Sequence, residues 1–193
     1  MIDASAPFVL LDDARRSDAS PARLYKAPHS TIVATSAVEL EHAFEELRVA
    51  QQAGLHVAGY LSYEAGFALE PKLSNKLEGR HIPTPLCWFG IFDGYTEIAA
   101  DDVPGLLPKP DGSWLGTVRP AISRAAYGKA FDAVEDYIEA GDIYQANLTF
   151  PLSGSWRGDP VALYAAIRPH ASAGYGGIVF DGSSWLLSFS PEL

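Results

Sequence analysis

Two stretches of the chain place hydrophobic residues at the spacing of one face of an α-helix. The first begins after Ser36, which has a glutamate three residues later as in a capping box, and it stops before Gly54. The second occupies residues 127–138 and is ended by Gly141. A third helix is expected over residues 161–168, because an aspartate followed by a proline precedes it. The pattern therefore predicts three amphipathic helices.

Short apolar runs bounded by glycine, proline or acidic residues predict β-strands between and after these helices. The last two runs are joined by the turn dipeptide Asp181-Gly182, which predicts a hairpin. The predicted strands are residues 8–11, 31–34, 55–63, 86–92, 176–180 and 185–189.

Residues 142–150 change from the helical period to strict alternation, which is typical of a strand. Gln145, Asn147 and Thr149 share its polar face. One interpretation is the solvent side of an antiparallel strand. The other is a substrate-side polar face, in which amide side chains orient a polar ligand.

Prolines interrupt residues 96–120, and no regular element is expected there. We interpret this stretch as a connector that runs over the surface.

The charge and the cysteine content restrict the class of protein. A net charge of −10 does not favour binding to nucleic acid or to anionic membranes, which requires a basic face. The single cysteine, Cys87, lies in an apolar run and is interpreted as a small buried hydrophobe. Without a signal peptide pattern or an apolar run of about 20 residues, the sequence predicts a cytoplasmic protein that is not in a membrane.

Metal and phosphate motifs are weak in this sequence. The five histidines are not spaced to share a helix turn or a strand face, so no metal site is predicted in this chain. The charged run of residues 12–16 is interpreted as a solvated turn rather than a site.

The sequence ends directly after the predicted hairpin strand, at Ser190-Pro191-Glu192-Leu193. Chain termini are usually solvated, so we expect this polypeptide to be the front part of a longer protein. Glu192 is either a solvated carboxylate or, held behind proline and partly buried, a general acid or base.

Three motifs in the second half of the chain resemble those of the chorismate-utilising enzymes. They are Gly141-Asp142-Ile143-Tyr144-Gln145-Ala146-Asn147-Leu148, the segment 169–175, and Ser188-Phe189-Ser190-Pro191-Glu192-Leu193. Three motifs in the first half resemble component I of aminodeoxychorismate synthase in particular; they are residues 8–15, 22–25 and 59–66.

The resemblance implies an α+β fold, with two sheets in a sandwich and helices outside. It implies that residues 1–120 form the N-terminal component I domain, with the proline-rich connector at its end, and that residues 121–193 begin the chorismate-binding domain. It also implies amination of chorismate to 4-amino-4-deoxychorismate, for para-aminobenzoate and folate synthesis. The ammonia would come from a glutamine amidotransferase subunit, and Mg²⁺ would hold the substrate.

The same resemblance implies roles for particular residues. Glu192 corresponds to the family's catalytic acid/base. Asp13, Gly174, Tyr175 and Gly176 correspond to a regulatory pocket that binds tryptophan in some members. Here Asp13 replaces a serine and Gly174 replaces a proline, so tryptophan is not expected to bind.

The lysine motif and the metal-binding glutamates that the resemblance implies are not in this sequence. The chain by itself is therefore expected to be inactive, because proton transfer alone supplies only about 10²–10⁴-fold of rate. Two alternatives stay open, namely component I of anthranilate synthase and a non-catalytic lobe that docks the amidotransferase subunit.

Overall fold

The structure is a computed structural model that describes residues 2–77, 79 and 82–191. The chain divides into two compact units. The first contains residues 1–110 and 160–193, and the second contains residues 111–159. Each unit is described separately below.

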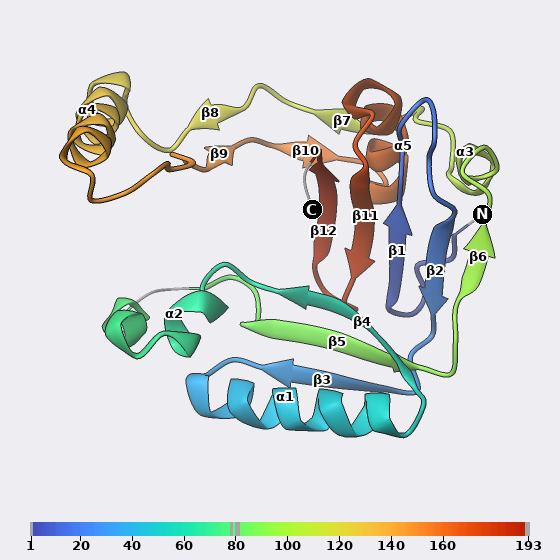
Figure 1. Cartoon of the computed structure of the whole chain (residues 1–193). Coiled ribbons are helices and arrows are strands. Elements are labelled where there is room, and N and C mark those ends of the chain that lie inside the picture. Colours follow the sequence, from blue (N-terminus) through green and yellow to red (C-terminus); the bar gives the residue numbers. More distant parts are fainter. Residues whose placement is uncertain (1, 78, 80–81, 192–193) are drawn as a thin grey trace. The chain divides into compact units, whose positions relative to one another are not determined.

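The first unit contains a five-stranded antiparallel sheet with the strand order β12-β11-β1-β2-β6 (Figure 1). The closing hairpin of the chain thus pairs with the first strand, since Asp12 of β1 lies opposite Gly176 of β11. The strand and hairpin predictions for residues 8–11, 176–180 and 185–189 are confirmed, whereas β2 and β6 were not predicted. The bounds are β1 Phe8–Asp12, β2 Ala22–Lys26, β6 Thr96–Ile98, β11 Tyr175–Phe180 and β12 Trp185–Ser190.

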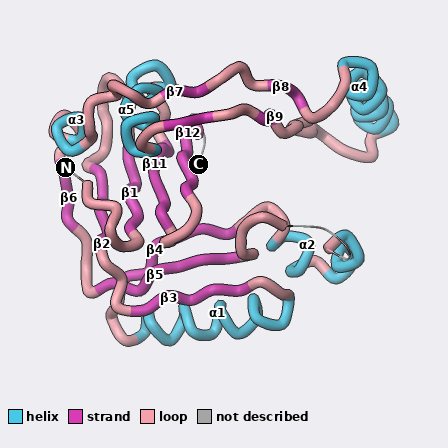
Figure 2. Tube along the Cα trace, turned by 180° about the vertical axis from the view of Figure 1, so that it is seen from behind, coloured by secondary structure: helices cyan, strands magenta, loops and turns pink. Residues whose placement is uncertain are grey.

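The second sheet of this unit has three antiparallel strands in the order β3-β5-β4. Helix α1 lies along one face of it in both views (Figures 1 and 2). The three strand predictions and the helix prediction are confirmed here. The elements are β3 Ser30–Ala34, α1 Ala37–Gln52, β4 His56–Leu61 and β5 Cys87–Phe92.

Local chemistry explains where α1 begins and ends. The Ser36 side chain accepts a hydrogen bond from the Glu39 backbone N–H, as the N-cap pattern predicts. The chain leaves the helix through Gly54, whose φ of 79° is left-handed. The buried face of α1 is Leu40, Ala43, Leu47 and Ala50.

The remaining elements of the first unit are helical. Helix α5 confirms the third predicted helix and begins at the predicted proline. The 96–120 stretch contains β6, α3 and two short strands, so the expectation of no regular element there is wrong. The bounds are α2 Ala65–Leu69, η1 Pro71–Lys76, α3 Val103–Leu106 and α5 Pro160–Ala171.

The two sheets of the first unit meet through buried aromatic and aliphatic side chains. Val9 and Tyr25 of the five-stranded sheet pack with Ala58, Trp88 and Phe92 of the three-stranded sheet. The Tyr60 hydroxyl also donates a hydrogen bond to Asp181, in the turn between β11 and β12, over 3.2 Å. The sheets therefore form one packed body.

The second unit contains helix α4, Arg124–Ala140, which confirms the helix predicted over residues 127–138 and ends at Gly141 as predicted. Its N-cap is Ser123. Residues 142–150 form no strand, so that prediction is wrong. The strands of this unit form two antiparallel pairs instead, β7 with β10 and β8 with β9. Their bounds are β7 Trp114–Leu115, β8 Arg119–Pro120, β9 Leu152–Ser153 and β10 Trp156–Arg157.

The mixture of helices and antiparallel sheets confirms the α+β class. The division of the chain into these two compact units does not test where the family's domains begin. The predicted domain boundary after residue 120 therefore stays a prediction.

Candidate functional site

A cleft of about 790 Å³ lies in the first unit, against the five-stranded sheet and β4. Strands β1, β11 and β12 supply most of its apolar wall, and β4 adds Gly59 and Tyr60. The loop after β1 supplies the polar residues Asp13, Arg15 and Ser20. The cleft is therefore apolar along its strands and charged at the end where β1 stops.

Gly176 and Gly177 allow the backbone of β11 to lie close to β1 and α5 at this cleft. A Cβ added to Gly177 would lie 2.5 Å from the Leu10 carbonyl oxygen, and one added to Gly176 would lie 2.8 Å from the Tyr164 hydroxyl. Side chains at these positions would clash with the neighbouring strand and with α5. The Gly176-Gly177 pair thus lets β11 lie close to β1 and to Tyr164.

Asp12, at the end of β1, is held by two residues of α5. Its carboxylate accepts hydrogen bonds from the Tyr164 hydroxyl at 2.7 Å and from Arg168 Nε at 2.6 Å and Nη2 at 2.9 Å. The Asp12 side chain is fully buried, and the Arg168 side chain is only 12% exposed. Burial, and then the neighbouring Asp12 carboxylate, raise the pKa of the Tyr164 hydroxyl, so it remains a donor. This network fixes α5 against the polar end of the cleft.

Asp13 is bound from its own loop. Arg15 donates to it through Nε at 2.9 Å and Nη2 at 2.6 Å, and the Ser20 backbone N–H donates over 2.9 Å. The Arg15 hydrogen bonds lower the pKa of the Asp13 carboxyl well below its usual range, although burial opposes this effect. The carboxylate is therefore ionised and already neutralised by Arg15.

This shift predicts a pH dependence of stability. Because the pKa of Asp13 is lower in the folded chain, the stabilisation is complete above the unfolded value of about 3.9 and is lost as the pH falls further. We expect the Asp13→Asn variant to lose less stability than the native chain between pH 7 and pH 3, by about 1 kcal/mol, since Arg15 is half exposed. Urea midpoints at the two pH values measure this. Asp18→Asn, at an exposed neighbouring carboxylate, is the control, and an identical loss in both variants would contradict the prediction.

Arg23, on β2, also lines the cleft and is exposed. Its guanidinium lies 5.2 Å from the centre of the Tyr95 ring, a cation–π contact. Within the described part of the chain it has no carboxylate partner, unlike Arg15 and Arg168. It therefore gives the cleft a positive charge without a carboxylate in direct contact, although Glu97 of β6 lies opposite it in the strand pairing.

The structure brings together four residues that the sequence assigned to one pocket. Asp13, Gly174, Tyr175 and Gly176 all line this cleft. The Arg15 side chain also occupies the space beside Gly174, because a Cβ there would lie 3.4 Å from Arg15 Cδ. Their regulatory role stays a prediction.

The interpretation of residues 12–16 as a solvated turn is wrong for its acidic members. Asp12 and Asp13 are 5% and 6% exposed. The sequence reasoning missed Asp12, Arg23 and Arg168 as parts of this site. Two adjacent aspartates at the end of an apolar strand were the available signal, but the partner on α5 lies 156 residues away.

The other predicted site residues are placed differently. Gln145, Asn147 and Thr149 are exposed and belong to the second unit, outside any strand. Without a strand they share no pleated face, and their role toward a substrate stays a prediction. Glu192 lies outside the described residues.

Three further features concern the class of the protein. Across the described residues, no group of three or more His, Cys, Asp or Glu side chains could hold a metal ion. Cys87 is buried as predicted, and burial raises the pKa of its thiol. No helix within the described ranges is long and apolar enough to cross a membrane.

Comparison with known proteins defines the class. Residues 6–193 match the family described as chorismate binding enzyme. This chain belongs to the chorismate-binding enzyme family.

Two curated relatives are similar over part of the chain. Anthranilate synthase component 1 of Thermus thermophilus is 43% identical over 91 residues, which are 46% of this chain and 20% of that protein. Aminodeoxychorismate synthase component 1 of Klebsiella aerogenes is 30% identical over 74 residues, which are 38% of this chain and 16% of that protein. The matched segments thus span a fifth or less of these relatives.

Proposed function

We propose that this chain serves the amination of chorismate, as component I of aminodeoxychorismate synthase. The observation that carries the proposal is the family match over residues 6–193. The motifs at residues 8–15, 22–25 and 59–66 support the para-aminobenzoate branch. In this role the protein would receive ammonia from a glutamine amidotransferase subunit, with Mg²⁺ bound to the substrate by residues that this sequence does not contain.

The second candidate is component I of anthranilate synthase. It is favoured by the higher identity to the Thermus relative, 43% against 30%. Both candidates act on chorismate and differ in the aminated product, so the product decides between them.

Deleting the gene in its own organism separates the two candidates. If the proposal is correct, the deletion strain requires para-aminobenzoate for growth and does not respond to tryptophan. A strain rescued by tryptophan alone would support the anthranilate branch instead. Growth without either supplement would contradict both.

The 193-residue chain itself can be assayed with chorismate, ammonium and Mg²⁺. We expect no aminated product, because Glu192 would act without the lysine motif of the family. Formation of aminodeoxychorismate or anthranilate by the purified chain would contradict this expectation.

We propose that the cleft is a regulatory pocket whose ligand is not tryptophan. The Asp13 carboxylate is already bound by Arg15, and the Arg15 side chain fills the space beside Gly174. Added tryptophan, at about 1 mM, is therefore expected to leave the thermal midpoint unchanged, whereas a ligand at 100 times its Kd would stabilise by about 2.7 kcal/mol. Thermal unfolding with and without tryptophan measures this, with alanine as the control additive. A midpoint raised by several degrees with tryptophan alone would contradict the expectation.

A further inference from the structure

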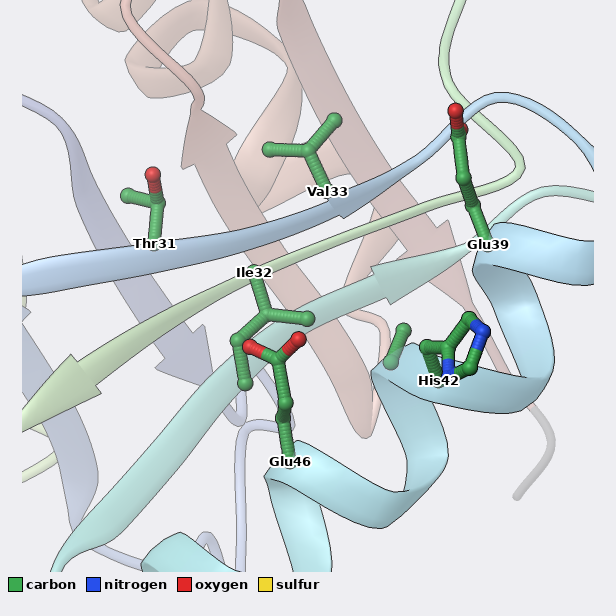
Figure 3. Close-up of a pocket in the computed structure, with 7 residues that line it drawn as sticks. Thr31, Ile32, Val33, Glu39, His42 and Glu46 are labelled. Carbon is green, nitrogen blue, oxygen red and sulfur yellow. The ribbon is translucent and has the colours of Figure 1, made fainter.

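A second depression lies on the first unit, between strand β3 and helix α1. Its volume is about 350 Å³. Thr31, Ile32 and Val33 line it from the strand, and Figure 3 shows Glu39, His42 and Glu46 lining it from the helix. We call this depression the β3–α1 groove. It does not share a residue with the cleft described above.

Strand β3 forms the edge of its sheet at this groove. Among the described residues β3 pairs with β5 and with no other strand. Natural edge strands are usually protected by proline, by lysine or by a bulge. Residues 30–34 contain no proline and no charged side chain, so this edge has none of the usual protecting residues. Such an edge can accept a further extended segment through backbone hydrogen bonds.

The groove has an apolar base and an acidic wall. Ile32 and Ala43 are buried beneath it, at 5% and 2% exposure. The Glu39 carboxylate accepts hydrogen bonds from the Thr35 backbone N–H and hydroxyl, each at 2.7 Å. These hydrogen bonds lower the pKa of Glu39, so it is ionised at neutral pH. Glu46 is a second carboxylate, and no lysine or arginine lines the groove.

We propose that the β3–α1 groove binds an extended basic segment of another protein, which adds a strand beside β3. Alternate side chains of an added strand are about 7 Å apart and would point to the helix side. Glu39 and Glu46 are seven residues apart on α1, which is about 10 Å along the helix axis. Lysine or arginine side chains at alternate positions of the partner can therefore reach both carboxylates.

A second copy of this chain is a poorer occupant. Pairing two β3 strands would bring the glutamates of one groove toward those of the other, and the chain already carries a net charge of −10. Like charges at an interface disfavour the complex. The charge of the groove thus selects a basic partner.

Peptide titration of the ¹⁵N-labelled chain tests the proposal, which is independent of the chorismate function. The probe is an acetylated and amidated Lys-Val-Lys-Val-Lys peptide. One control replaces its lysines by glutamates, and another carries N-methyl groups on every residue. We expect the basic peptide alone to bind, with amide shift changes confined to residues 30–34 and α1.

Two matched variants test whether a carboxylate of the groove contributes to the affinity for the basic peptide. Glu46→Gln should weaken binding of the basic peptide about threefold, as for one exposed ion pair. Glu41→Gln removes the same charge from the same helix outside the groove and should leave the affinity unchanged.

Four results would overturn the proposal. The first is equal binding of the basic and acidic peptides, and the second is unchanged affinity when every backbone nitrogen of the peptide is methylated. The third is shift changes located elsewhere on the chain. The fourth is a dimer, seen by sedimentation, that Glu46→Gln strengthens, since the occupant would then be a second copy.

Discussion

The Arg168→Met variant is expected to lose about 3–5 kcal/mol of the free energy of unfolding. The substitution keeps the apolar stem that packs in α5 and removes the guanidinium bonded to Asp12 through two nitrogens. The Asp12 side chain is fully buried, so its carboxylate would be left with the Tyr164 hydroxyl as its remaining side-chain donor. Urea unfolding followed by circular dichroism measures the loss.

Two comparisons separate the buried ion pair from a general effect of removing an arginine. Arg48→Met removes an exposed arginine from the pair with Glu45 on α1, and we expect a loss of at most about 1 kcal/mol. The double variant Asp12→Asn/Arg168→Met removes both charges, and we expect it to be more stable than Arg168→Met alone. Equal losses in Arg168→Met and Arg48→Met would show that the Asp12 pair does not fix α5.

The same ion pair shows what the sequence could and could not predict. Strands and helices were predictable because their signals are local. Ser36 caps its own helix, Gly141 ends another, and the hairpin turn at Asp181-Gly182 lies between its two strands. The pairing of Asp12 with Arg168 has no local signal, because it depends on β11 bringing α5 beside β1. Two acidic residues after a strand were consequently interpreted as a solvated turn.

The incorrect strand at residues 142–150 has a different physical reason. Alternation of polar and apolar side chains predicts a pleated segment only if neighbouring backbone groups pair with it. Within the described residues that stretch has no partner strand, and Tyr144 is 92% exposed. Alternation alone is therefore not sufficient to predict a strand. The residues Asp13, Gly174, Tyr175 and Gly176 were grouped by family motif and line one cleft, and their regulatory role stays a prediction.

Gly59 of β4 is the glycine whose replacement should cost most. A Cβ at this position would lie 2.0 Å from the Trp88 carbonyl oxygen and 2.6 Å from Phe89 Cα. Both atoms belong to the backbone of β5, which is paired with β3 on its other side and so has little freedom to move away. We expect Gly59→Ala to lower the free energy of unfolding by about 3 kcal/mol, at the upper end of the cost of overpacking.

Gly66→Ala is the matched control for this effect. Gly66 is exposed in α2, and no atom lies within 4 Å of an added Cβ. Alanine there should be neutral or stabilise by up to about 1 kcal/mol, because it restricts the unfolded chain and suits a helix. Urea unfolding of both variants provides the comparison. Gly59 and Tyr60 line the cleft from β4, and Trp88 packs between the two sheets. The Gly59→Ala substitution should therefore also disturb the packing of Trp88, which a shift of the tryptophan emission would show. A Gly59→Ala chain as stable as Gly66→Ala would show that β4 and β5 do not approach this closely.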